Sequence, residues 1–459
     1  MRRILAAALF LLAIAAPASP QETPPKKPAE PDRAGDLQKE MTALRGLKFT
    51  QKVVVGEYSR AELLAFIRKE LEKELPRPEA DKIRKALVHF GLIPADLDFY
   101  QTVIDLLGGS IAGFYHPKTK ELRLIKPGEG EEAEDAQTRD MTLVHELCHA
   151  AQDQNFDLNT LPIELKTNDD VVLATQALVE GDATIVGLKW ALKDRFDAVA
   201  SLITASYKSG DLGEGVRKVP ACLRKTLAFP YGYGSEFVLA LLGRAKDDWS
   251  AVSKVFDDLP GSTEQILHPK KYFGEARDYP QDVSIEGLEG IVAGGWKLTT
   301  HNVNGEFGTR LVLDEFKVEK SSMRRDAAEG WDGDRYFVFE NAAGGLAGTW
   351  FTTWDSEDDA KEFQAIYTTL LAAKHEGAER TPADQKVTFT KGGVTAVLER
   401  RGADVLIIDG FGPDVAGRLN KIWSAVKKTE VRKVERVVPK ETPKEVPKEA
   451  PKEAPKDPK

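Results

Sequence analysis

Residues 141–152 read MTLVHELCHAAQ and lie in a predicted helix from Glu134 to about Phe156, whose apolar residues can anchor it in a core. His145 and His149 are four residues apart, so they lie on one helical face and can direct two imidazoles to one ion. Glu146 lies about 100° around the helix, beside a metal-bound water. This H-E-x-x-H spacing predicts a zinc site with a base next to it.

A third ligand is expected because zinc sites that do chemistry use three protein ligands and leave a fourth position for water. A second predicted helix runs from Asp169 to about Phe196, after an Asn-Asp-Asp cap signal, and contains ATQALVEGDATIVGLKW at 174–190. Its Glu180 is a carboxylate in apolar sequence and would be costly to bury without a cation. Glu180 is therefore the predicted third ligand.

The residues around Glu180 suggest how the two helices meet. Gly181 and Ala183 are small, which would let this helix approach the histidine helix closely. Asp182 would then accept a hydrogen bond from the outer nitrogen of a ligand histidine. Rival third ligands in more polar sequence remain open; they are Asp153, Asp157 and Glu164.

Length and composition indicate an ordinary globular chain with more than one core. Its 459 residues are 42% hydrophobic and 30% charged. A net charge of -9 without a basic stripe argues against nucleic acid as a partner. Cys148 and Cys222 form either one disulfide or two small buried thiols.

Both ends of the chain are expected to lie outside the fold. Residues 1–18 have the charged, apolar and small-residue order of a secretory signal peptide, which predicts export to the periplasm or the extracellular space. No later segment is expected to span a membrane. Residues 19–35 predict a Pro-rich spacer, and 429–459 a disordered Pro-Lys-Glu tail that is either a surface-associated tether or simply solvated.

The overall pattern predicts an α+β protein of two domains. A mainly helical domain over 36–294 has helices at 60–75, 79–90 and 236–256 and a β hairpin within 109–126. A smaller α+β domain over 295–428 has strands at 336–340, 348–353, 387–390, 394–399 and 405–409, and helices at 358–374 and 414–427.

The paired motifs resemble the gluzincin branch of the zincin metallopeptidases, the thermolysin-like group, in which an HExxH helix is followed by a helix carrying a Glu ligand. The metzincin pattern is absent, since Gln152 and Asn155 stand where its Gly and third ligand would be. A closer resemblance is to uncharacterised exported bacterial proteins that combine GFYxPxT, HELxHAxQDQxFDL, LVEGDAT, FPYxxG, STEQILHPxKY and GWDGDR. The resemblance implies a zincin-like fold, one zinc ion held by His145, His149 and Glu180, and an edge strand for an extended peptide.

The expected function is that of an exported zinc metallopeptidase acting on a peptide or protein substrate, with Glu146 as general base. A second oxyanion donor is expected in addition to zinc, and His268 is preferred over Tyr231, Tyr233 and Tyr115. Two alternatives are a zinc amidohydrolase acting on cell-wall peptide and a non-catalytic envelope binding protein with a structural zinc. An intact Glu146 disfavours the last, because a closed structural site has no use for a base.

Overall fold

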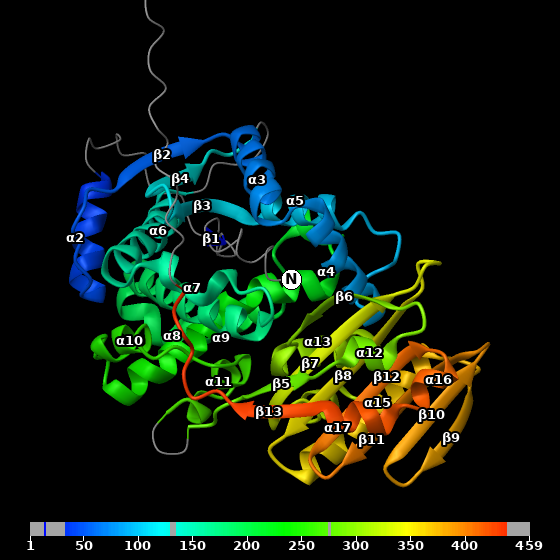
Figure 1. Ribbon diagram of the computed structural model, residues 1–459. Helices are drawn as coiled ribbons and strands as arrows, with labels where there is room; N and C mark the ends of the chain where they lie inside the picture. Colours follow the sequence, from blue (N-terminus) through cyan, green and yellow to red (C-terminus); the bar gives the residue numbers. More distant parts are fainter. Residues whose placement is uncertain (1–12, 15–32, 129–134, 274–276, 438–459) are drawn as a thin grey trace, which may run out of the picture.

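The computed structural model describes residues 13–14, 33–128, 135–273 and 277–437, and shows an α+β protein with two parts (Figure 1). The predicted signal peptide, apart from Ala13 and Ile14, lies outside the described residues, as does the tail from residue 438. The first part is mainly helical. The second part is built around a seven-stranded sheet.

The helical part contains a small sheet at one side of a stack of long helices (Figure 1). Its elements are β1 (Ala13–Ile14), α2 (Arg33–Arg45), β2 (Val54–Tyr58), α3 (Arg60–Glu74), α4 (Arg77–His89), α5 (Phe99–Ser110), β3 (Ile111–His116), β4 (Glu121–Ile125), α6 (Ala136–Phe156), α7 (Asp169–Leu192), α8 (Phe196–Lys208), α9 (Ala221–Ala245), α10 (Ser250–Val255) and α11 (Thr263–Leu267).

Local capping explains where the two central helices begin. The side chain of Asp135 accepts hydrogen bonds from the backbone N–H groups of Gln137 and Thr138 at the start of α6. Asn168 accepts from Val171 N–H at the start of α7. Each cap satisfies backbone donors that have no partner inside the helix. The predicted helices α3, α4, α6 and α7 are confirmed within a few residues of their expected ends.

The prediction for α9 was wrong at its start, because the helix begins at Ala221 instead of Glu236. Pro230 and the glycines of FPYGYG lie inside this helix. A Cβ on Gly234 would lie 2.1 Å from the Ala177 carbonyl oxygen of α7, and one on Gly181 would lie 2.3 Å from the Gly234 backbone. Gly181 therefore permits close packing of α7 on α9, and not on α6 as we expected.

The small sheet has the order β1-β3-β4-β2. Strands β3 and β4 form the predicted antiparallel hairpin, β2 runs parallel to β4, and β1 pairs with β3. The hairpin packs on α6, so it lies beside the helix that carries the two histidines.

The second part of the chain is an antiparallel sheet with the order β6-β7-β8-β12-β11-β10-β9. Its elements, with the ribbon and helices that accompany it, are β5 (Gln281–Ile285), α12 (Leu288–Val292), β6 (Lys297–Asn302), α13 (Gly305–Glu315), α14 (Ser321–Asp326), β7 (Trp331–Glu340), β8 (Leu346–Trp354), α15 (Glu357–Lys374), β9 (Glu379–Ala383), β10 (Lys386–Lys391), β11 (Val394–Arg401), β12 (Asp404–Phe411), α16 (Pro413–Ala416), α17 (Leu419–Ala425) and β13 (Val426–Glu430).

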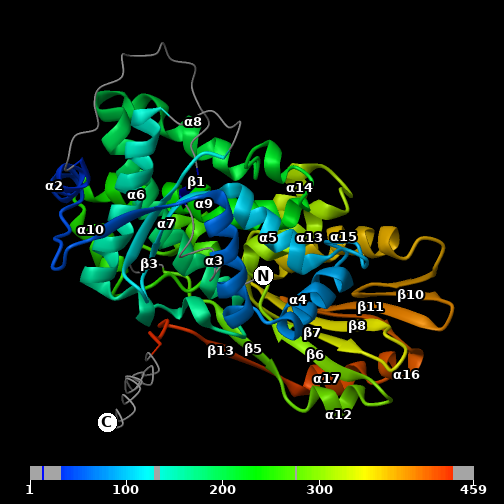
Figure 2. The same ribbon diagram turned by 90° about the horizontal axis from the view of Figure 1, so that it is seen from above.

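Alternation along β12 places helices on both faces of the large sheet. Val405 and Ile407 belong to the core that includes α15, and Leu406 and Ile408 belong to a second core with α12 and α17 (Figure 2). The first core continues without interruption into the long helices of the first part. The two parts are therefore packed on each other.

Residues 429–437, which we expected in a disordered tail, are ordered. Strand β13 pairs with β5, and the chain then returns to the helical part, where Val437 N–H donates to Thr160 O. Arg436 donates to the carbonyl oxygens of Phe156 and Phe256. The predicted spacer also ends earlier than expected, because α2 begins at Arg33.

One helical stretch of the described chain, residues 169–208, is long and apolar enough to cross a membrane by length and composition alone. Our expectation that no later segment spans a membrane stays a prediction, because one such stretch is weak evidence for a span. Its most apolar window is entirely buried within the protein, as in the core helix of a globular fold.

Candidate metal centre

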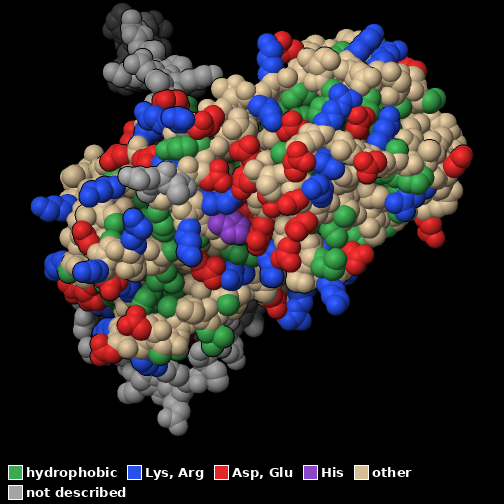
Figure 3. Space-filling model, turned by 90° about the horizontal axis from the view of Figure 1, so that it is seen from below, with side chains coloured by type: hydrophobic (Ala, Val, Ile, Leu, Met, Phe, Trp, Pro, Cys, Tyr) green, Lys and Arg blue, Asp and Glu red, His purple; other side chains and the backbone are tan. Residues whose placement is uncertain are grey.

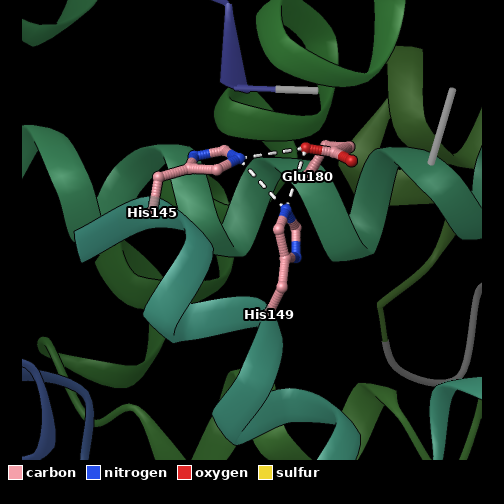
Figure 4. Close-up of side chains that lie close together, drawn as sticks. All are labelled: His145, His149 and Glu180. Carbon is pink, nitrogen blue, oxygen red and sulfur yellow. Dashed lines mark hydrogen bonds and ion pairs between the residues drawn. The ribbon is translucent and has the colours of Figure 1, made fainter. Parts of the chain in front are cut away.

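Three predicted ligands converge between α6 and α7. His145 and His149 project from one face of α6 toward Glu180 of α7 (Figure 4). The two Nε2 atoms lie 3.1 Å apart, and each lies 3.3 Å from Glu180 Oε2. A tetrahedral ion with bonds of about 2.0–2.1 Å keeps its ligand atoms roughly 3.3 Å apart. The three donor atoms therefore fit zinc.

The three ligand side chains are buried, and their charges influence each other. Burial alone would raise the pKa of Glu180, but His149 and His145 hold it below its ordinary value. Burial opposes protonation of His149, yet the Glu180 carboxylate outweighs it and raises the pKa of His149 to about 9. A divalent cation at this point would take over the role of the protons.

Glu146 also lies in this buried region. It is completely buried, and neither of its carboxylate oxygens has a hydrogen-bond partner among the described residues. Burial raises the pKa of Glu146 to about 8, and the charge of Glu180 adds to the rise while His149 opposes it. An unpartnered buried carboxylate is costly, which makes Glu146 a candidate functional group beside the three predicted ligands.

The outer nitrogen of His149 contacts Gln152, a residue the sequence analysis did not select. His149 Nδ1 lies 2.9 Å from Gln152 Oε1. We expected Asp182 to accept a hydrogen bond from one of the histidines, but this prediction was wrong. Asp182 accepts instead from Gln152 Nε2 at 3.0 Å and from Arg45 Nε at 2.7 Å. The position of Gln152, three residues after His149, was the only signal in the sequence that might have revealed it.

Tyr231 lies at the metal centre, whereas His268, the preferred oxyanion donor, does not. The Tyr231 ring stacks 6.2 Å from His145, and burial together with the nearby Glu180 and Glu146 raises the pKa of Tyr231 well above its ordinary value. His268 Nε2 contacts Glu306 at 3.0 Å. The helix before His268, α11, contacts α7 at Asp170, which precedes Glu180 by ten residues or about 15 Å.

The remaining candidates have other partners. Tyr115 donates to Asp153 at 2.7 Å, and Tyr233 lies under Lys208. Among the rival ligands, Asp153 also pairs with Lys120, and Glu164 pairs with Lys118. Asp157 accepts from Asn159 after the end of α6. The convergence of Glu180 with the histidines sets it apart from all three rivals.

A second group of carboxylates lies near the junction of the two parts, and acidic side chains gather beside a histidine on the face seen in Figure 3. Glu264, Asp278 and Asp355 approach one another closely enough to hold a metal ion. Lys271 Nζ, however, lies 2.6–2.8 Å from all three. The lysine supplies the positive charge, so this group is a salt-bridge cluster.

Two of the quoted motifs also meet at this junction instead of at the metal centre. Thr263 of STEQILHP donates its backbone N–H to Asp170 at the start of α7. Asp334 of GWDGDR accepts from the backbone N–H groups of Asn304 and Gly305. Thr263 Oγ1 also accepts a hydrogen bond from the Phe307 N–H of α13, so the STEQILHP motif connects the helix that carries Glu180 to the second part of the chain.

The two cysteines are both free and buried, which excludes the disulfide that the sequence left open. Cys148 lies on α6 in a core with Leu147 and Ala183, and its burial, with the nearby Asp182, raises the pKa of its thiol well above the ordinary value. It acts as a packing residue.

One family model, described as a domain of unknown function (DUF8575), matches residues 296–420. The match covers most of the large sheet and does not reach α6 or α7. No curated protein and no solved structure matches the chain.

Proposed function

We propose that this protein is an exported, zinc-dependent metallopeptidase of the gluzincin-like type. The observation that carries the proposal is the convergence of His145, His149 and Glu180, with donor atoms 3.1–3.3 Å apart, beside the unpartnered carboxylate of Glu146. Three ligands with a neighbouring base are the arrangement of a catalytic zinc site.

The chemistry follows from the positions of the side chains. Zinc, when bound, supplies a Lewis acid for the scissile carbonyl and a water of lowered pKa. Glu146 accepts the proton of the attacking water on its carboxylate and then delivers it to the nitrogen of the leaving amine. Tyr231, beside His145, replaces His268 as the proposed donor to the developing oxyanion.

Substrate class distinguishes this proposal from the zinc amidohydrolase alternative. The proposed substrate is a peptide or protein that pairs as an extended strand with β3, which packs on α6, along the edge that β1 of the predicted signal peptide occupies. Purified protein would be incubated with an unfolded protein and with peptidoglycan, and the products identified by mass spectrometry. Release of peptides from the unfolded protein is expected; release from peptidoglycan alone would favour the amidohydrolase.

The decisive experiment separates metal binding from catalysis. Bound metal and hydrolysis of the unfolded protein would be measured for wild type, Glu146→Gln and Glu180→Ala. We expect one zinc per chain in wild type, retained zinc with lost activity in Glu146→Gln, and weakened zinc binding in Glu180→Ala. Glu164→Gln, an exposed carboxylate paired with Lys118, is the control and should match wild type.

Normal hydrolysis by Glu146→Gln would rule out the proposed base. A zinc ion that stays bound in wild type while no amide substrate is cleaved would favour the envelope binding protein with a structural zinc.

A further inference from the structure

The outer side of the metal centre contains a row of buried polar residues that leads away from His149 to the N-terminal helix. We infer that Gln152, Asp182 and Arg45 form a positioning relay that fixes the orientation of the ligand His149. This inference rests on the proposed zinc site. It extends that site to α2, which the sequence patterns did not connect with metal binding.

The orientation of the Gln152 amide is determined by its neighbours. Gln152 Nε2 lies 3.0 Å from Val179 O and 3.0 Å from Asp182 Oδ2. A backbone carbonyl and an ionised carboxylate only accept hydrogen bonds, so the NH2 group must face them. The amide oxygen must therefore face His149 Nδ1, at 2.9 Å.

The amide orientation determines how His149 is held. Because Gln152 Oε1 only accepts, His149 Nδ1 must carry the proton. His149 Nε2 therefore faces Glu180 Oε2 and His145 Nε2, which lie 3.3 and 3.1 Å away, and it is the nitrogen left to bind a metal that displaces its proton. The relay thus presents the correct nitrogen to the metal before the metal arrives.

Arg45 holds the far end of the relay in place. It is 1% exposed and pairs with the completely buried Asp182 through two hydrogen bonds, Nε to Oδ1 at 2.7 Å and Nη2 to Oδ2 at 3.0 Å. Its guanidinium also lies 4.9 Å from the Trp249 ring and donates to Ser253 Oγ at 3.1 Å. This planar two-point pairing keeps Asp182 aimed at Gln152.

Helix α2 carries Arg45 to this position. Leu37, Met41 and Arg45 follow one another at intervals of four residues and are all buried against α6 and α7. Docking of α2 is therefore part of building the metal centre.

The relay can be tested by exchanging the donor and acceptor roles of residues 152 and 182, a polarity reversal that keeps the size of both side chains. Gln152→Glu alone sets two carboxylates against each other, and Asp182→Asn alone weakens the pairing with Arg45 and Gln152. In the double variant, the amide introduced at position 182 donates to the carboxylate introduced at position 152, which still accepts from His149. Zinc affinity would be measured by competition with a chromophoric chelator, together with the visible spectrum of the Co²⁺-loaded proteins.

Each single substitution should weaken zinc binding by about 10- to 100-fold, the usual effect of losing a partner of a metal ligand. The double variant should recover about tenfold of that loss, since the two sites are coupled. Recovery is incomplete because Val179 O loses its donor and because an amide nitrogen in the place of Asp182 Oδ2 cannot accept from Arg45 Nη2. The Co²⁺ spectrum should change in the singles and return toward wild type in the double.

Arg45→Met provides a second test, with Arg33→Met as its control. Arg33 lies on the same helix but pairs with Asp140 and Glu40 at the partly exposed end. Arg45→Met should weaken zinc binding about tenfold or more, and Arg33→Met should not. If Arg45→Met fails to fold because Asp182 is left buried and unpaired, the zinc affinities of the polarity-reversal variants at positions 152 and 182 decide whether the relay exists.

The relay would be overturned if the single variants bound zinc as tightly as wild type, or if the double variant bound zinc no more tightly than the weaker-binding single variant. Either result would leave the peptidase proposal intact. If wild type binds zinc and the reversal shows coupling, but no substrate is cleaved, the peptidase proposal fails and the relay stands.

Discussion

Two of the buried carboxylates of helix α7, Glu180 and Asp170, are affected in opposite ways by their surroundings. Glu180 is 2% exposed and Asp170 is 1% exposed. Burial raises the pKa of Asp170 to about 7. The negative charges of the nearby Asp334 and Glu306 add to this rise, whereas the hydrogen bonds from Thr263 oppose it. Burial acts on Glu180 too, but the two histidines lower its pKa below the ordinary value.

The difference shows what distinguishes a ligand from a structural carboxylate. Asp170 Oδ1 accepts from the backbone N–H and the hydroxyl of Thr263, groups that fix its position but carry no charge. Glu180 instead faces two imidazoles whose nitrogens point at the same oxygen. Burial is common to both, so the convergence of donor atoms, and not burial, is the reason that we propose Glu180 as the metal ligand.

The largest effect is expected when Glu180 is changed to Gln. The substitution keeps the size of the side chain and removes one anionic ligand of three, so zinc affinity should fall on the order of 1,000-fold, about 4 kcal/mol. Chelator competition would measure it. Asp170→Asn is the matched change on the same helix and should leave zinc affinity within about twofold.

The same pair of variants tests metal-linked stability. Zinc at about 100 times its dissociation constant should stabilise wild type by about 2.7 kcal/mol. The stabilisation should persist in Asp170→Asn and vanish in Glu180→Gln, as measured by denaturant unfolding with and without zinc. An equal gain in both variants would mean that zinc binds elsewhere.

Asp170 should govern how stability depends on pH. The folded protein binds this proton more tightly than the unfolded chain, whose ordinary pKa is 3.8. The contribution of Asp170 to stability is therefore fully present below pH 3.8 and is lost as pH rises through about 7, on the order of 4 kcal/mol in total.

Asp170→Asn should flatten this part of the stability profile, because the amide stays neutral and still accepts from Thr263. Unfolding by urea between pH 4 and 8, in the absence of zinc, would measure the slope. Asp194→Asn removes the same charge from an exposed position beyond the end of α7 and should leave the profile unchanged. An unchanged slope in Asp170→Asn would show that Asp170 is ionised throughout.

The sequence predicted the parts of the molecule that depend on local pattern. The spacing of His145 and His149 places them on a common helical face. The apolar sequence around Glu180 indicated a buried carboxylate that needs a cation. Each of these features lies within a single helix. The alternating strands of the large sheet were recognised for the same reason. The described structure confirms that these ligand side chains converge.

Features that depend on contacts between distant segments could not be predicted in this way. Gln152 supports His149 only because Val179, Asp182 and Arg45, from two other helices, fix its amide. His268 appeared catalytic in its motif, but its partner Glu306 lies 38 residues later in the second part of the chain. Neither pairing leaves a periodic signal.

The expected packing partner of Gly181 was wrong, since this residue of α7 meets α9 and not α6, and it suggests the prediction with the smallest expected effect. A Cβ at Gly181 would lie 2.3 Å from the Gly234 backbone of α9, so Gly181→Ala should push the helices apart and cost about 1–3 kcal/mol. Gly187→Ala, on the same helix, meets Met141 at an ordinary 3.5 Å and should be neutral or stabilising by up to about 1 kcal/mol. Thermal unfolding compares the two. Because Gly181 adjoins Glu180, Gly181→Ala should also weaken zinc binding, whereas equal stability of both variants would show that α7 and α9 are not packed this closely.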